Sequence, residues 1–464
     1  MRIAVIGAGT FGTYAAAVLA EQCPHAEIHV FEVGDKRCQS EAEIGYLSRG
    51  SSRYQGLSKG RYFGLGGTSN RWGGQVLTFS TCEFAEPSPF LSEIVQLNER
   101  YRADIARRLG IPLPAREVDL GNGLHSKEGV WLSYNRRNLY RTLRLDRMPA
   151  IKIRLGCRVT RLEARSNTVT ALTIKQGQNL SVETFDFYVL ASGAFESNRL
   201  LMISGLSEPR MSFSDHLSRR AFVLNGPRKF GALDFEFRLK RGCMLTRRLV
   251  GEVEGVSFFV HPIFNADFAF FQDLKGLLYR REFSRVSGLM SHAGDGMRFL
   301  AEALLRRRLY VHGPWFLQVD VEAPLETGWI ELAEEGDIYG ERGLNYEFSV
   351  STAVDKTYEG AVAKTREVLS QNGGSFSEVD ADFTQGKYED TYHPFGMFGS
   401  QSGSLNEFYG LYSNLLIANT GILPRAGSIN CTAAIFPVIE DCIKSRFTRE
   451  IVIGRTTSQK GEQG

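Results

Sequence analysis

The sequence lacks paired cysteines. Its seven cysteines are an odd number, scattered between Cys23 and Cys442, and no two of them form a CxxC pair. Disulfide frameworks and zinc sites depend on cysteines at short, regular spacings, so we expect neither, and no metal site is predicted. A reducing compartment is the simpler interpretation, and we expect a cytoplasmic protein.

Long apolar runs and a strong charge of one sign are also missing. No stretch of about 18 consecutive apolar residues occurs, which argues against a membrane-spanning helix. The net charge of +3 gives no indication of a nucleic-acid partner, and we expect none. The hydrophobic fraction of 43% and the charged fraction of 23% are near globular averages, which excludes disordered and fibrous proteins.

Glycine is the residue in excess. It accounts for 48 of the 464 residues, somewhat above the average of about 7%, and it shows no collagen-like period. Such an excess suits a protein whose backbone passes close to a ligand at several places.

The clearest local motif lies at the amino end. Residues 2–6 read Arg-Ile-Ala-Val-Ile and predict a buried strand, and the GxGxxG motif of Gly7, Gly9 and Gly12 leads from it into a predicted helix. Gly7 permits the tight turn, Gly9 lets the backbone approach a pyrophosphate, and Gly12 lets the helix pack closely on the strand. The helix N-terminus then presents free N–H groups and a positive dipole end to the phosphates.

A second predicted strand, residues 27–32, ends in Glu32, twenty residues after Gly12. A carboxylate at this position accepts hydrogen bonds from the ribose hydroxyls of an adenosine, which favours FAD or NAD over NADP. The motif alone does not separate FAD from NAD. The cofactor-binding residues predicted in this region are Gly7, Gly9, Thr10, Phe11, Gly12 and Glu32.

A second cluster of glycines occupies residues 64–74, which read Gly-Leu-Gly-Gly-Thr-Ser-Asn-Arg-Trp-Gly-Gly. Five glycines around an embedded tryptophan do not suit an ordinary helix or strand, and they predict a loop laid against a large flat ligand. The segment resembles the flavin-contacting segment of the glucose-methanol-choline (GMC) oxidoreductases, which carry a GGxSxxW-type pattern after the nucleotide-binding motif.

Further segments resemble the same family, in the family's order. Residues 188–201 resemble the strand-to-helix passage of its flavin domain, and Asp215–His216 resembles the pair that closes that passage. Residues 392–397 resemble its His-x-x-G element, and residues 414–432 resemble its carboxyl-terminal region. The resemblance spans nearly the whole chain and is nearest to the pyranose oxidase and sugar dehydrogenase members.

The resemblance implies roles for single residues. It makes His393 the base that takes the substrate's hydroxyl proton while hydride leaves for flavin N5, and it makes Asn430 the partner that hydrogen-bonds the substrate oxygen. Histidine suits the first role because its ordinary pKa lies near neutrality, and Asn430 can also cap the helix that follows it. We expect a structural role for His216 at the domain junction. The further cofactor-binding residues implied are Gly67, Thr68, Asn70, Arg71, Trp72, Gly73, Val159, Ala191, Asn419 and Thr432.

The sequence departs from the family pattern at three positions. Asn419 occupies the place where many members have Asp near the flavin pyrophosphate, and Cys431 replaces the usual Pro after the catalytic Asn or His. Some members attach the flavin covalently through a His just before the motif Trp. Arg71 occupies that position here, which implies non-covalent FAD.

The resemblance also implies the fold class, which is α/β with two domains. We predict a Rossmann-like FAD-binding domain of the GMC type and an α+β substrate domain built on an antiparallel sheet. The FAD-binding domain would comprise residues 1–85, 150–216 and 394–450, the substrate domain residues 86–149 and 217–393, and a disordered tail residues 455–464.

Patterns within these domains predict several elements. Apolar alternation at 152–155, 158–162 and 168–174 predicts a small β-meander. Alternating runs at 316–322 and 328–332 predict an antiparallel sheet. A helix is expected from about Val354 to Asn372, where two glycines follow.

A basic stretch lies between Leu274 and Trp315. It could form an amphipathic lid that touches a membrane or an anionic substrate. The favoured interpretation is that its charges cover the solvated faces of helices, so that membrane contact is not expected. Its basic residues are Lys275, Arg280, Arg281, Arg285, Arg298, Arg306, Arg307 and Arg308.

The leading hypothesis is an FAD-dependent oxidoreductase that oxidises a CH–OH group of a sugar, glycoside or related small-molecule alcohol, with oxygen or another electron acceptor. A flavin-containing lyase on the same scaffold and a catalytically inactive FAD-binding protein are the alternatives. An NAD dehydrogenase remains the outside possibility, since fold does not determine function.

Overall fold

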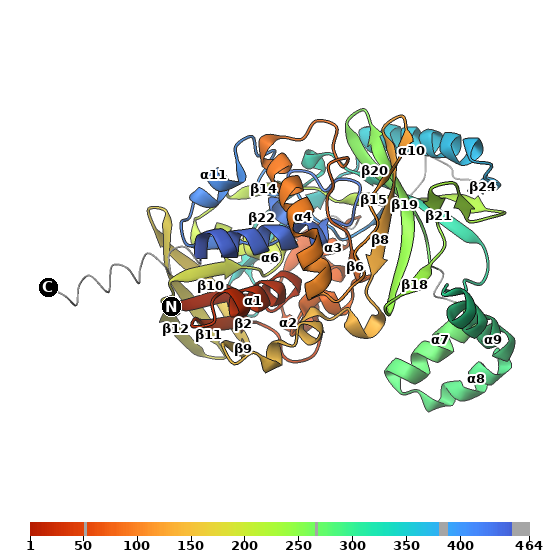
Figure 1. Ribbon diagram of the computed structural model, residues 1–464. Coiled ribbons are helices and arrows are strands. Elements are labelled where there is room, and N and C mark those ends of the chain that lie inside the picture. Colours follow the sequence, from red (N-terminus) through yellow and green to blue (C-terminus); the bar gives the residue numbers. More distant parts are fainter. Residues whose placement is uncertain (51–52, 265–267, 380–387, 448–464) are drawn as a thin grey trace, which may run out of the picture.

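The computed structural model describes residues 1–50, 53–264, 268–379 and 388–447 (Figure 1). The predicted disordered tail at 455–464 lies outside the described residues. Apolar residues of the described part are buried in two main clusters, one around a parallel sheet and one around a larger antiparallel sheet.

The parallel sheet has five strands, and all of its pairings are parallel. Strands of a parallel sheet are buried on both faces and therefore consist of continuous apolar runs. Ile3 to Ile6 and residues 187–190 are two such runs, and both are buried. Helices α1 (Thr10–Gln22) and α12 (Ile435–Cys442) pack together beside it. In order across the sheet, the strands are β26 (Leu415–Ile417), β13 (Phe187–Leu190), β1 (Arg2–Ile6), β2 (Glu27–Glu32) and β9 (Ile151–Leu155).

A three-stranded meander lies next to this sheet, and its composition corrects one prediction. It consists of β10 (Cys157–Arg165), β11 (Thr168–Gln176) and β12 (Asn179–Glu183). The run at 152–155, which we assigned to the meander, instead lies in β9 and pairs in parallel with β2. Gly156, with φ +63°, separates β9 from β10.

The run at 316–322 lies in an antiparallel sheet, as predicted, and this sheet is the largest one among the described residues. Its ten strands include a main path of seven, in the order β24 (Phe376–Glu378), β15 (His216–Leu224), β21 (Trp315–Glu322), β20 (Val256–Pro262), β19 (Cys243–Val253), β8 (Leu124–Trp131) and β6 (Gln75–Val76). Strands β18 (Arg238–Lys240), β25 (Glu389–Asp390) and β7 (Val118–Gly121) pair at its sides.

The run at 328–332 lies in a different sheet from the run at 316–322. It belongs to β22, which pairs antiparallel with its neighbours β14 and β23, and β4 adds a parallel edge strand. The strands of this four-stranded sheet, in order, are β14 (Arg210–Phe213), β22 (Gly328–Gly336), β23 (Arg342–Phe348) and β4 (Ser48–Gly50).

The segment 86–149, predicted to belong to the substrate domain, contributes to both clusters. Helix α4 (Pro89–Arg108) packs on α12, and Phe90 and Ile94 share the buried cluster of the parallel sheet. Strand β8, by contrast, lies in the ten-stranded sheet. Segment 86–149 therefore contacts both clusters, and the domain boundary at residue 86 stays a prediction.

The remaining helices divide between the body and a projecting module. Helix α10 (Thr352–Gln371) confirms the expected helix near 354–372 and packs on β21, while α6 (Ala194–Ser204) and α11 (Leu405–Gly410) lie in the body (Figure 1). Helices α7 (Ala269–Lys275), α8 (Val286–Ser291) and α9 (Ala293–Ala301) project beyond the large sheet (Figure 1). None of the helices in the described ranges is both long and apolar enough to cross a membrane.

Candidate active site

One cavity of about 460 Å³ joins segments from both ends of the chain. Its size falls within the usual range for ligand pockets, about 300–1,000 Å³. Fifteen of the eighteen predicted site residues line it. They are Gly7, Gly9, Thr10, Phe11, Glu32, Gly67, Thr68, Arg71, Trp72, Gly73, Val159, Ala191, His393, Asn430 and Thr432.

The turn between β1 and α1 forms one wall of the cavity. Gly7 adopts φ +100°, and a Cβ there would lie 2.7 Å from the carbonyl oxygen of Ala191, so only glycine fits. Gly9 begins α1, and no side chain caps that helix end. The N–H groups of its first turn are therefore available to a ligand in the cavity.

Glu32 holds three backbone segments together at the end of β2. Its Oε2 accepts a hydrogen bond from the N–H of Ala8 at 2.8 Å, and its Oε1 accepts from the N–H groups of Gly34 and Gly64, both at 2.9 Å. Burial raises the pKa of this carboxyl, while the three N–H donors act in the opposite direction. Besides lining the cavity, Glu32 thus ties the first glycine motif to the second glycine cluster.

The second glycine cluster packs against the first. A Cβ on Gly67 would lie 2.7 Å from the Cα of Gly9, so the two backbones approach as closely as glycine allows. Trp72 donates a hydrogen bond from Nε1 to the carbonyl oxygen of Arg137 at 2.9 Å, which fixes the indole at the cavity wall. The exposed Arg71 places its guanidinium 5.6 Å from the centre of the Tyr62 ring.

Three predicted site residues do not line the cavity, and two of them support residues that do. A Cβ on Gly12 would overlap the carbonyl oxygen of Gly7, so Gly12 permits the helix to pack on the turn. Asn70 donates hydrogen bonds from Nδ2 to the carbonyl oxygens of Leu65 and Gly67 and holds the loop. Asn419 is fully buried, and its Oδ1 accepts a hydrogen bond from the N–H of Gly421.

His393 lies at the other end of the chain and lines the same cavity. Burial, together with the neighbouring His216 and Arg248, lowers its pKa to about 3, whereas Asp320 acts in the opposite direction. The imidazole is therefore neutral at physiological pH, and its buried Nδ1 has no hydrogen-bond partner among the described residues. A neutral imidazole with a free nitrogen is able to accept a proton.

Asp215 positions the loop that carries His393. It is fully buried, and its Oδ1 accepts hydrogen bonds from the N–H of His393 at 2.9 Å and from the hydroxyl of Thr391 at 2.8 Å. Its Oδ2 accepts from the hydroxyl of Tyr54 at 3.0 Å. The pair formed by residues 215 and 216 thus connects the start of β15 to the His393 loop.

The potential ligand atoms of Asp215, His216 and His393 lie within 4.8 Å of one another, a spacing that could suit a metal ion. The carboxylate of Asp215 also accepts the N–H of His216 at 2.8 Å, so four donors already surround it. In addition, Nε2 of His216 is 2.7 Å from the carbonyl oxygen of Gly427. These contacts describe a hydrogen-bonded junction and not an open coordination site.

Asn430 performs the expected capping role. Its Oδ1 accepts a hydrogen bond from the N–H of Thr432 at 3.3 Å and caps the 3₁₀ turn Cys431–Ala434, which leads into α12. The positive end of that turn and helix therefore points toward the cavity that Asn430 and Thr432 line.

Arg248 is a residue near the site that the sequence analysis missed. It lies in β19, is 1% exposed, and none of its three guanidinium nitrogens has a hydrogen-bond partner among the described residues. Its guanidinium carbon lies 4.7 Å from the centre of the Phe259 ring, and that ring lies 5.3 Å from the ring of His216. Burial lowers the pKa of Arg248 to about 10.

No family model and no curated protein matches this sequence. Among solved structures, the chain is similar to pyridoxine 4-oxidase from Mesorbium loti, with 16% sequence identity and a TM-score of 0.57. The match covers 97% of this chain and 98% of that chain. The likeness shows that the chain has the overall fold of that protein, a mixed α/β fold with large sheets.

Proposed function

We propose that the chain is an FAD-dependent oxidoreductase that oxidises a CH–OH group of a sugar, glycoside or related alcohol to a carbonyl. In this proposal His393 is the base, Asn430 hydrogen-bonds the substrate oxygen, and a Rossmann-like domain built on the five-stranded sheet binds FAD without a covalent link. The structural likeness to pyridoxine 4-oxidase, whose name denotes an oxidase, supports the reaction class.

The observation that carries the proposal is the convergence of distant segments on one cavity. The two glycine segments line it together with His393 and Asn430, more than 300 residues later in the chain. A dinucleotide-binding turn and a neutral imidazole in one cavity are the two components that flavin-dependent alcohol oxidation requires.

The residues present fit an extended flavin nucleotide. The closest atom to a Cβ built on Gly9 is the Cα of Gly67 at 4.0 Å, so this backbone borders open space from which a pyrophosphate could approach. The uncapped first turn of α1 offers N–H groups to phosphate oxygens. When bound, FAD would supply the hydride acceptor.

His393 would hold the hydroxyl proton of the substrate on a ring nitrogen. Its depressed pKa keeps the imidazole unprotonated before the substrate arrives. A weak base suffices because the hydroxyl proton becomes more acidic as hydride leaves the same carbon. Asp215, which accepts the N–H of His393, would hold the loop in place during this transfer.

The preference for a sugar and the non-covalent cofactor are supported by the sequence pattern. The His393 and Asn430 pair and the segment 64–74 resemble sugar-oxidising members of the GMC family. Arg71 is exposed and directed over Tyr62, and arginine is not a residue through which these enzymes attach flavin. Acid precipitation of the purified protein should therefore release the yellow cofactor into the supernatant.

An anaerobic substrate panel tests the activity. Purified yellow protein is mixed with candidate sugars, glycosides and simple alcohols without oxygen, and a substrate should bleach the flavin absorbance near roughly 450 nm. His393→Ala should retain FAD but slow bleaching by about 10² to 10⁴-fold. His25→Ala, at an exposed histidine, is the matched control and should bleach at the wild-type rate. Purification of a colourless protein would contradict the proposed FAD-dependent function. Equal bleaching rates in His393→Ala and the wild type would contradict the role of His393 as the base.

A further inference from the structure

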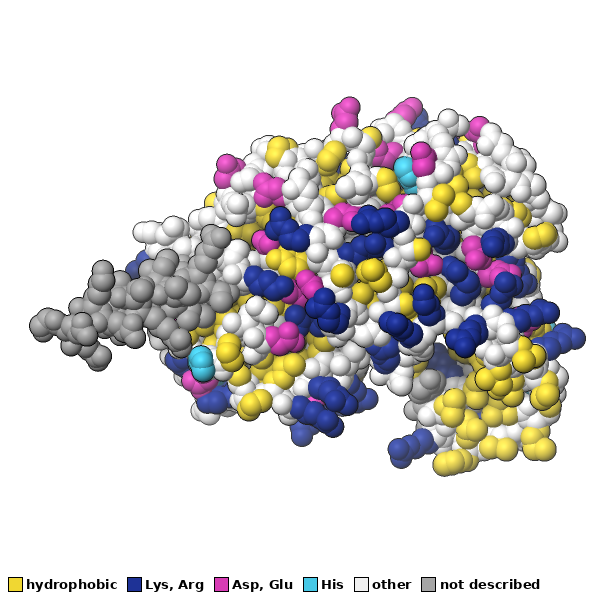
Figure 2. Space-filling view, in the orientation of Figure 1, with side chains coloured by type: hydrophobic (Ala, Val, Ile, Leu, Met, Phe, Trp, Pro, Cys, Tyr) yellow, Lys and Arg dark blue, Asp and Glu magenta, His cyan; other side chains and the backbone are white. Residues whose placement is uncertain are grey.

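The projecting helical module, residues 268–312, carries an unusual share of exposed apolar side chains. Eight of the seventeen large hydrophobic residues that are exposed in the described chain lie in it, with exposed fractions from 43% to 83%. Figure 2 shows them as a dense apolar area on the module at the lower right. The most exposed are Phe283, Met290, Met297, Leu304 and Leu305.

Four of the eight side chains lie on two consecutive helical segments. Met297 and Leu300 lie in α9 at the i and i+3 spacing of one helix face, and Leu304 and Leu305 lie in the π-helical turn Glu302–Arg306 that follows directly; these four exposed side chains are the apolar stripe. The stripe points outward, because the other side of α9 already packs inward. There, a Cβ on Gly296 would lie 2.8 Å from the ring of Phe270.

The module therefore has two apolar surfaces but only one internal core. Phe270 and Phe299 approach with ring centres 5.9 Å apart and fill the inner side. A helix in contact with water alone has a polar outer face, so the outer stripe requires a further partner. The sequence-based interpretation, in which the charges of the basic stretch cover solvated helix faces, does not account for this apolar stripe.

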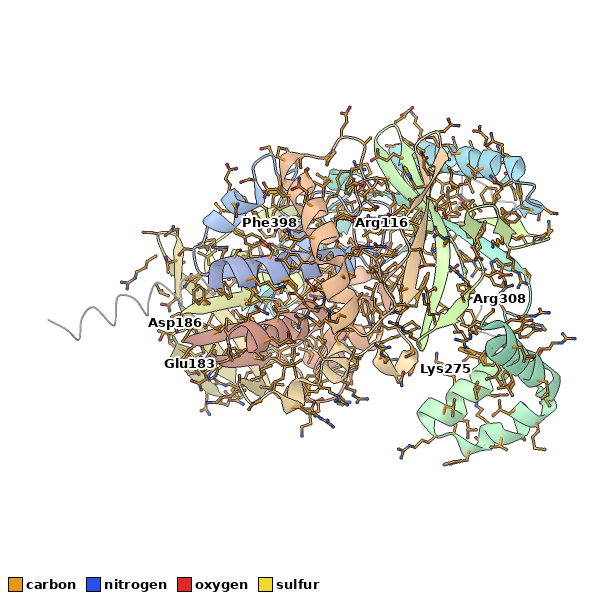
Figure 3. The ribbon with its side chains drawn as sticks, viewed as in Figure 1. Arg116, Glu183, Asp186, Lys275, Arg308 and Phe398 are labelled. Atoms are coloured by element: carbon orange, nitrogen blue, oxygen red, sulfur yellow. The ribbon has the colours of Figure 1, made fainter. Side chains whose placement is uncertain are left out.

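The net charge of the module indicates an anionic partner. Residues 268–312 contain eight Lys or Arg and four Asp or Glu, a net charge of +4, whereas the whole chain carries +3. The remainder of the chain is therefore at −1. Arg281 and Arg307 are exposed and have no ion-pair partner among the described residues, and Lys275 and Arg308 lie on the side of the module nearest the body (Figure 3).

We propose that this module docks onto an anionic lipid surface, with its apolar stripe in the interface and the exposed side chains of Arg281 and Arg307 against the headgroups. An amphipathic helix with exposed Leu, Met and Phe beside Lys and Arg binds membranes in this manner. A second copy of the chain is the less suitable partner, because its own module would bring a like charge of +4 against the first.

Vesicle sedimentation with the full-length purified protein tests the proposal. The protein should sediment with phosphatidylglycerol–phosphatidylcholine vesicles and not with phosphatidylcholine vesicles alone. Raising the salt from about 0.05 to 0.5 M should weaken the binding, because the Debye length falls severalfold. Substituting Phe283→Ser, Met290→Ser, Leu304→Gln and Leu305→Gln together should reduce vesicle affinity by at least about a hundredfold.

Matched variants distinguish vesicle binding through the module from vesicle binding through exposed apolar residues elsewhere. The control combines Leu180→Gln, Val182→Gln, Ile338→Gln and Leu411→Gln, four exposed apolar positions outside the module, and should bind vesicles like the wild type. In a second test, Arg281→Glu with Arg307→Glu leaves the apolar stripe intact and should lower affinity by about fivefold or more per position.

Three outcomes would overturn the proposal. The first is that the wild type binds neither kind of vesicle. The second is that it binds both kinds equally and independently of salt. The third is a concentration-dependent dimer, seen by light scattering, that the four apolar substitutions dissociate while vesicle binding is absent.

Discussion

The neutral state of the half-buried His393 makes a quantitative prediction about stability. Its pKa is about 3 in the folded protein, against about 6.5 in an unfolded chain. Between these values the unfolded chain binds a proton that the folded protein does not. The contribution of this group to stability is therefore fully present above pH 6.5 and is lost as the pH falls toward 3. The loss is about 1.4 kcal/mol per pH unit.

At pH 5 this loss amounts to about 2 kcal/mol relative to pH 7.5. The unfolding entropy of a chain of this length is about 1 kcal/mol per kelvin, so the melting temperature should fall by about 2 °C from this group alone. His393→Gln replaces the imidazole with a side chain that stays neutral throughout, so this part of the fall should disappear.

Thermal unfolding of wild type and His393→Gln at pH 7.5 and pH 5.0 measures the difference. Other groups contribute equally to both proteins, so the comparison isolates His393. His25→Gln, at an exposed position, should keep the wild-type pH dependence. If the melting temperatures of wild type and His393→Gln fall by the same amount between the two pH values, His393 has an ordinary pKa in the folded protein and the prediction is wrong.

Three further substitutions test the geometry around the cavity. Gly9→Ala should fold normally, because its Cβ meets nothing closer than 4.0 Å, but it should lower the ratio of bound flavin to protein measured by absorbance. Gly12→Ala should reduce the free energy of unfolding by about 1–3 kcal/mol or more, seen as a lower melting temperature, because its Cβ overlaps the Gly7 carbonyl oxygen. Arg248→Met should raise stability by about 1–4 kcal/mol, since it removes a buried charge without hydrogen bonds. It should also raise the pKa of His393 and move the acid limb of kcat/KM to higher pH.

Sequence motifs could locate those site residues whose role depends on their neighbours along the chain. Gly7, Gly9 and Gly12 are recognisable because a turn, a close backbone approach and a helix packed on a strand each require glycine within a few residues. Glu32 is recognisable because it ends the next strand. All but Gly12 line the cavity, and Gly12 supports its wall from behind.

Sequence patterns failed where one pattern fits two arrangements. Alternation at 152–155 suits an edge strand of a parallel sheet as well as a strand of a meander, and only the pairing with β2 distinguishes them. No motif in residues 89–108 indicates the partner of α4, which is α12. The basic stretch between Leu274 and Trp315 is also ambiguous, because the direction of its apolar stripe depends on which side Phe270 and Phe299 occupy.

Arg248 and Asp215 show why buried charges near a site are hard to assign from sequence. Both are fully buried within the region around His393, yet Asp215 accepts four hydrogen bonds while the guanidinium of Arg248 makes none with the described residues. A fully bonded carboxylate holds its neighbours in place, which suits the positioning of the His393 loop. An unbonded guanidinium acts through its charge, and here it adds to the effects of burial and of His216, which lower the pKa of His393. The two residues thus act on the same side chain in different ways, one on its position and the other on its protonation, and the difference depends on contacts from strands far apart in the chain.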